Sequence, residues 1–172
     1  MGVGNVLLSD EGVGVRIIEE LEHRYRFPEE VEILDGGTSG IELLRFFDDR
    51  DHLIIVDAVS ADHPPGTVMR IEGADVPATF ETRITPHQLG LSDLLATAKL
   101  TDQMPAYLVL FGIEPKSLET GLGFSPEVEE AVGKVVVHVA EELRRLGYNL
   151  EECSSPGACA SRFWGNREGQ GG

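Results

Sequence analysis

The apolar residues of the chain recur at helical spacing in some stretches and form short continuous runs in others. Over residues 10–26 they return every three or four positions and so line one face of a predicted helix. Further helices are expected over residues 40–47, 89–99 and 126–146. Pro126 suits the first turn of the last helix, and Gly147 suits its end.

Between the helices lie short apolar runs that predict strands. These runs cover residues 31–34, 53–56, 67–71 and 107–111. The runs at 53–56 and 107–111 are continuously apolar, as in strands that are covered on both faces. Strands that alternate with helices predict an α/β fold, a single domain with a twisted, mostly parallel sheet flanked by helices on both faces.

The two ends of the chain differ from this pattern. Residues 1–5 are typical of a loop that leaves a sheet strand, so we expect the first strand to be missing from this chain and the true start to lie upstream. Residues 150–172 are rich in glycine and serine, which predicts a flexible tail after a domain of residues 1–149. The tail carries Cys153 and Cys159, which could form a disulfide.

The charge of the chain narrows the choice of partners. Fourteen lysines and arginines stand against 30 acidic residues, which gives a formal net charge of −16 over 172 residues. Such acidity disfavours nucleic acids and anionic membranes, because both attract basic surfaces. No apolar run approaches the ~18–20 residues that a membrane span needs, and no signal peptide is visible. We therefore expect a cytoplasmic protein, and a monomer because no apolar stripe remains after the core faces are assigned.

Candidate chemistry follows from position, because the sequence contains no Gly-x-Ser-x-Gly, Walker A, His-Glu-x-x-His or Cys-x-x-Cys signature. Open α/β sheets bind ligands beyond the carboxyl ends of their strands. Asp35 and Asp57 each follow a predicted strand. Glu11 begins the first helix on the same edge, and His87 lies in a loop before a helix that can reach this edge.

Two or three carboxylates and one imidazole suit a divalent or transition metal, or the activation of water. Each residue also has a structural alternative. Glu11 can complement the helix dipole, and Asp57 can end its strand by bonding to loop amides. Asp35 before two glycines is a common turn residue, and His87 can be a solvated loop residue.

Six segments of the sequence, in order, carry a family pattern. They are residues 4–14 (GNVLLSDEGVG), 32–38 (EILDGGT), 51–58 (DHLIIVDA), 65–67 (PGT), 85–90 (TPHQLG) and 111–119 (FGIEPKSLE). Together, over residues 2–146, they resemble the nickel–iron hydrogenase maturation endopeptidases.

This resemblance implies an α/β endopeptidase that removes a short C-terminal peptide from the large-subunit precursor of a nickel–iron hydrogenase after nickel insertion. It assigns metal contact to Glu11, Asp57 and His87 and places Asp35 at a further acidic position near them. The implied metal is nickel, carried by the substrate on cysteine thiolates rather than bound permanently by the protease. The catalytic candidates are these same four residues.

Two other functions stay open at this point. One is a non-catalytic module that binds metal or escorts the same precursor as a chaperone. The other is a flavodoxin-like nucleotide binder, which fits the fold class but has only the weak Gly2-Val3-Gly4 as a phosphate loop.

Overall fold

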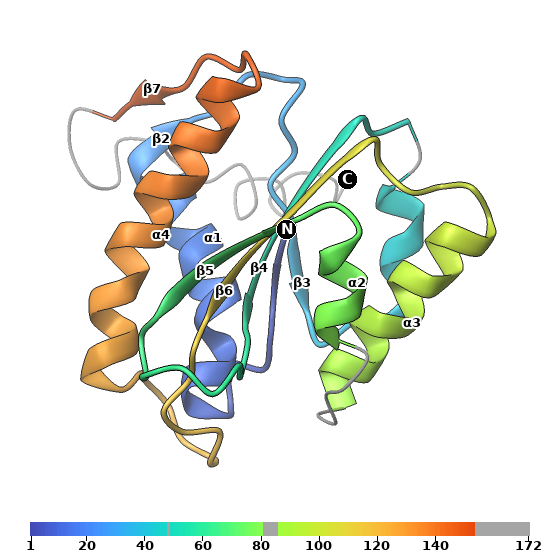
Figure 1. Ribbon diagram of the computed structural model, residues 1–172. Coiled ribbons are helices and arrows are strands. Elements are labelled where there is room, and N and C mark those ends of the chain that lie inside the picture. Colours follow the sequence, from blue (N-terminus) through green and yellow to red (C-terminus); the bar gives the residue numbers. More distant parts are fainter. Residues whose placement is uncertain (48, 81–85, 154–172) are drawn as a thin grey trace, which may run out of the picture.

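A five-stranded sheet lies between two layers of helices (Figure 1). The computed structural model describes residues 1–47, 49–80 and 86–153, with residues 86 and 87 described by their backbone alone. In spatial order the strands are β3 (Asp35–Gly37), β1 (Gly2–Val3), β4 (His52–Ala58), β6 (Tyr107–Ile113) and β5 (Val68–Glu72). The first four are parallel and β5 is antiparallel to β6, which confirms the mostly parallel α/β sheet.

The two long apolar runs form the centre of the sheet. β4 and β6 pair in register from His52 with Tyr107 to Ala58 with Ile113. Successive side chains of a strand point to opposite faces, so β4 contributes to both layers of the core. Ile54 and Val56 pack in the core on one face, while Ile55 packs on the other.

Two helices cover one face of the sheet, and α1 (Val13–Arg24) lies beside α4 (Pro126–Arg145) there (Figure 1). The core of this face includes Val13, Ile17, Leu21, Val56, Val109, Ile113, Val128, Val135 and Val139. The other face carries α2 (Asp75–Phe80), α3 (Pro86–Leu100) and the 3-10 helix η2 (Ile41–Phe46). Its core includes Leu43, Ile55, Val59, Phe80, Leu91, Leu94, Leu95 and Leu110.

The first strand is present, which corrects the prediction that it is missing. Gly2–Val3 form β1 between β3 and β4, with Gly2 opposite both Asp35 and Val56. The prediction of a strand at residues 31–34 is also wrong, since these residues form no strand. β1 offers pairing partners only at two positions, so pairing in β3 falls on Asp35–Gly37.

The helix expected from residue 10 begins as a 3-10 turn. This turn, η1 (Ser9–Gly12), precedes the α-helix that starts at Val13. Ser9, the first residue of this turn, has a φ of +47°, and its hydroxyl donates to the Glu119 carbonyl 3.0 Å away.

The beginning of the expected tail joins the domain. Leu150 is buried in the core, and β7 (Glu151–Glu152) pairs antiparallel with β2 (Tyr25–Arg26). Residues 154–172, with Cys159, lie outside the described residues. Within the described ranges, no helix has both the length and the apolar character needed to cross a membrane.

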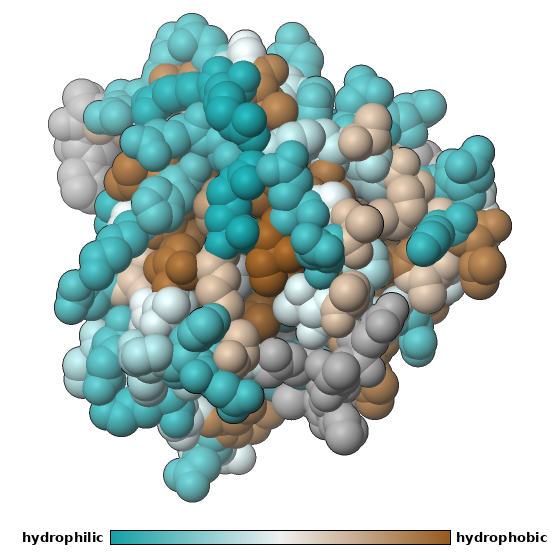
Figure 2. Space-filling view, viewed as in Figure 1, coloured by the Kyte–Doolittle hydropathy of each residue, from teal (hydrophilic) through white to brown (hydrophobic). Residues whose placement is uncertain are grey.

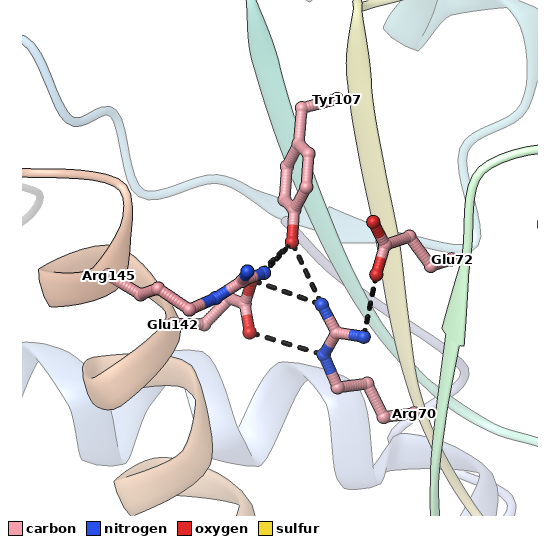
Figure 3. A network of polar contacts seen from close by, with 5 residues as sticks. All are labelled: Arg70, Glu72, Tyr107, Glu142 and Arg145. Atoms are coloured by element: carbon pink, nitrogen blue, oxygen red, sulfur yellow. Dashed lines mark hydrogen bonds and ion pairs between the residues drawn. The ribbon is translucent and has the colours of Figure 1, made fainter.

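A polar network fastens the edge strand β5 to α4 (Figure 3). Arg70 makes two hydrogen bonds of 3.2 Å to the Glu142 carboxylate and one of 2.8 Å to Glu72. Tyr107 and Arg145 also donate to Glu142. Burial alone would raise the pKa of Glu142, but the bonds from Arg70, Tyr107 and Arg145 lower it to about 2.

Candidate active site

Two buried carboxylates lie at the carboxyl-terminal edge of the sheet. Glu11 is 2% exposed and Asp57 is fully buried. Acidic side chains are rarely buried to this extent without a specific role or partner. Asp57 lies near the end of β4, and Glu11 lies in η1, which packs against β4. The structure therefore confirms the prediction that these two residues lie at one edge.

The Asp57 side chain points toward the layer that contains α3. Its partner in β6 is Gly112, and a Cβ at Gly112 would contact Val59 and Met69, which belong to the core of that face. Residues opposite each other in a sheet project to the same side. One Asp57 oxygen accepts the N–H of Ala58 at 2.8 Å.

Glycines allow the Glu11 segment to lie directly on the strand ends. Gly4 has a φ of +132°, and a Cβ there would lie 1.8 Å from the Glu11 carbonyl oxygen. A Cβ at Gly14 would lie 2.3 Å from the carbonyl oxygens of both Val3 and Val56. The start of this helix therefore packs on the strand ends by backbone contacts that leave no room for a Cβ at either position.

Asp10, next to Glu11, is a buried residue whose role the sequence did not reveal. Its carboxylate accepts backbone N–H groups from Lys116 at 2.9 Å, Ser117 at 3.0 Å and Ser125 at 2.7 Å. The Ser125 hydroxyl donates to it as well, at 2.9 Å. Burial alone would raise the pKa of Asp10, but these four hydrogen bonds lower it below its usual value. Asp10 thus ties the loop between β6 and α4 to the segment that carries Glu11.

Glu114 is a second buried carboxylate that fixes a loop near Asp57. It directly follows β6, is 6% exposed, and accepts the N–H of Ala61 at 2.6 Å and of His63 at 3.3 Å. It thereby fixes the loop that follows β4. An acidic residue directly after a buried apolar run is the signal that also indicated Asp57, and it could have identified Glu114.

His87 belongs to the first turn of α3, which corrects its expected place in the preceding loop. The neighbouring Gln88 is 5% exposed and donates from Nε2 to the Ala58 carbonyl at 3.4 Å. The first turn of α3 therefore lies at the end of β4, one residue beyond Asp57. The imidazole itself is outside the described side chains.

Asp35 is not brought together with Asp57. It is exposed and accepts the N–H of Gly37 at 2.9 Å, as a turn residue does. It lies opposite Gly2, as Val56 does, and so projects toward the α1 face, whereas Asp57 projects to the other face. Burial chiefly raises the pKa of Glu22 on α1, and the charge of Asp35 adds to this rise.

Comparison with known proteins identifies the family. The model of the hydrogenase maturation protease family matches residues 15–142. This chain is a hydrogenase maturation protease. It is 50% identical over 148 residues to the hydrogenase 2 maturation protease of Escherichia coli (strain K12), which covers 86% of this chain and 90% of that protein. It is 34% identical over 168 residues to the hydrogenase expression/formation protein HupD of Bradyrhizobium diazoefficiens, which covers 96% of this chain and 88% of that one.

A solved structure agrees with this assignment. The hydrogenase maturating endopeptidase HybD from Escherichia coli matches with a TM-score of 0.86 and 47% identity, over 89% of this chain and 95% of that one. The protease is therefore an enzyme, an endopeptidase with the α/β fold that the sequence predicted. Family membership decides against the nucleotide binder and the non-catalytic escort.

Three residues were expected to contact a metal. The structure describes the side chains of two of them, the carboxylates Glu11 and Asp57. For the third, His87, it describes only the backbone, in α3. Among the side chains that the structure describes, no group of three or more His, Cys, Asp or Glu is arranged to hold a metal ion. Carboxylates together with an imidazole suit a divalent or transition-metal ion.

Proposed function

We propose that this protease removes a short C-terminal peptide from the large-subunit precursor of a nickel–iron hydrogenase and recognises the nickel of that precursor through Glu11, Asp57 and His87. The observation that carries the proposal is the convergence of two buried carboxylates, from η1 and β4, beside the first turn of α3. Its similarity to hydrogenase maturation proteases supports the hydrogenase as the system that this protease serves.

The nickel enters this proposal as part of the substrate. Cysteine thiolates of the precursor hold the ion, and the protease offers further ligands of a kind that nickel accepts. A precursor without nickel presents no cation to the two negative charges of Glu11 and Asp57. Without the ion, the precursor offers these buried carboxylates no favourable electrostatic partner. Metal loading is therefore the condition for binding.

The hydrolytic step needs a water molecule, a base and a proton donor. Water adds to the scissile carbonyl carbon as its proton passes to a base, and the C–N bond breaks as the leaving nitrogen receives a proton. Carboxylate and imidazole groups both perform these transfers in proteins. Glu11, Asp57 or His87 takes up the proton of the water, and the protonated group then supplies the proton that the leaving nitrogen receives. Asp35 lies on the opposite face of the sheet, where it accepts the N–H of Gly37, and takes no part in this step.

Three single variants test the assignment. Glu11→Gln, Asp57→Asn and His87→Gln keep the size of the side chains and remove the charge or the basic group. We expect each to reduce the cleavage rate of nickel-loaded precursor by about 100-fold or more, the usual scale of an acid–base or electrostatic contribution. Glu130→Gln, an exposed change on α4, serves as the control and keeps full activity. Retained cleavage by all three site variants would refute the assignment.

A further inference from the structure

Two loops beside the carboxylate site expose apolar side chains. Val6 and Leu7, which precede η1, are 53% and 59% exposed. Leu118 and Leu122, in the loop between β6 and α4, are 37% and 85% exposed. Figure 1 shows this second loop extending past the lower end of the sheet, and Figure 2 shows brown, hydrophobic atoms at that end of the molecule. Exposed apolar residues gathered at one place indicate an interaction surface.

Hydrogen bonds join the two loops into one surface. The Ser9 N–H donates to the Gly121 carbonyl, and the Gly121 N–H donates to the Leu7 carbonyl, both at 3.0 Å. The Ser9 hydroxyl adds a third bond, to the Glu119 carbonyl. The four bonds to the buried Asp10 carboxylate fix the base of the second loop. The leucines are therefore presented by a fixed scaffold, so binding to them orders little additional chain.

This surface adjoins η1, the segment that carries Glu11. Leu7 lies four residues before Glu11 in the same segment, and Asp10, which anchors the second loop, is the neighbour of Glu11. A polypeptide that brings a metal ion to Glu11 and Asp57 thus passes next to these leucines.

We infer that Val6, Leu7, Leu118 and Leu122, here called the leucine rim, are the docking surface for an apolar segment of the precursor next to its metal centre. This inference rests on the proposed function. The four rim side chains are uncharged in a chain of net charge −16, so their complement is apolar rather than basic. The positive charge that the site requires is supplied at the carboxylates, by the metal ion of the substrate.

The chain offers a matched control for the rim. Leu100 is 87% exposed, like Leu122, but it is the last residue of α3. Because α3 begins at the carboxyl edge of the sheet and has 15 residues, Leu100 lies about 20 Å away from the site edge.

The test measures kcat and KM for cleavage of nickel-loaded precursor by the full chain and its variants. Leu7→Ser and Leu122→Ser are each expected to raise KM by about tenfold, the value of one buried leucine side chain, and to leave kcat within about twofold. Leu100→Ser is expected to leave both constants unchanged. An unchanged KM in both rim variants, or an equal rise in Leu100→Ser, would overturn the inference.

The proposed function and the docking surface can be refuted separately. If the wild-type chain cleaves the precursor and the rim variants cleave it with the same KM, the docking surface is wrong and the proposed function stands. If the wild-type chain neither cleaves nor binds the loaded precursor, the proposed function fails and the docking inference fails with it.

Discussion

Asp10 and Glu11 are adjacent buried carboxylates with separate roles. Asp10 accepts four hydrogen bonds from the loop at residues 116–125 and is therefore a structural ligand of that loop. Glu11 lies at the edge of the sheet with Asp57 and is the candidate for chemistry. The sequence indicated Glu11 and Asp57, because their place relative to predicted elements was enough. It could not indicate the role of Asp10, whose partners lie more than 100 residues away.

The Asp10 carboxylate should be essential for this loop. Asp10→Asn replaces one acceptor oxygen by an NH₂ group that faces N–H donors, so the free energy of unfolding should fall by about 1–3 kcal/mol. Urea unfolding measures this change. Glu119→Gln, an exposed change in the same loop, is the control and should leave the stability nearly unchanged. A stability of Asp10→Asn equal to that of the wild-type chain would show that the four bonds contribute nothing.

Gly14 and Gly133 should respond to alanine in opposite directions. Both lie in helices, where alanine is normally favoured by up to ~1 kcal/mol. A Cβ at Gly14 would meet two carbonyl oxygens at 2.3 Å, so Gly14→Ala should destabilise the protein and displace η1. A Cβ at Gly133 meets nothing within 4 Å, so Gly133→Ala should raise the unfolding temperature. Thermal unfolding of the two variants decides, and a stabilised Gly14→Ala protein would contradict the close packing.

At the scale of elements, the sequence predicted correctly those helices and strands that have a clear pattern of apolar residues, and it misplaced a strand that lacks one. Continuous apolar runs predicted β4 and β6, and apolar residues at helical spacing predicted α1 and α4. These apolar residues are buried in the core. β3 was misplaced, because its position depends on β1, a strand of two residues with no apolar run to reveal it. The same holds for the candidate site. Asp57 was placed correctly because the end of β4 was predicted correctly. Asp35 was grouped with Asp57 wrongly, because the strand that carries it was misplaced and a shift of one residue along a strand moves a side chain to the other face of the sheet.

The polar network between β5 and α4 should make the stability of the protein depend on pH. The pKa of Glu142 falls from 4.5 to about 2 on folding, so the folded state keeps this carboxylate ionised where the unfolded state protonates it. Its contribution is complete above pH 4.5 and is lost as the pH falls toward 2. Glu142→Gln should lower the free energy of unfolding by about 1–2 kcal/mol at pH 7, since the arginine partners are partly exposed and screened.

Urea unfolding of wild-type and Glu142→Gln proteins at pH 7 and pH 3 checks this prediction. The difference between the two proteins should be smaller at pH 3. Glu130→Gln, on the same helix but paired with Lys134 in solvent, should behave like the wild-type chain at both values. A difference for Glu142→Gln that stays constant with pH would contradict the assigned charge effect.

At the scale of the whole molecule, the site draws on three parts of the fold. The α1 layer contributes Glu11, the sheet contributes Asp57, and the α3 layer contributes the turn that carries His87. The rule that ligands bind at the carboxyl edge of parallel strands was therefore enough to predict from the sequence that Glu11 and Asp57 lie at one edge. The loop surface around it could not be predicted in this way, because the leucine rim arises from hydrogen bonds between segments far apart in the chain.

The mass of a hydrogenase large-subunit precursor after incubation with this protease tests the proposed function. The precursor is prepared with and without nickel, and both forms are measured at the same enzyme concentration. We expect that only the nickel-loaded form loses a short C-terminal peptide. Cleavage of both forms alike, or of neither form while binding is intact, would contradict it.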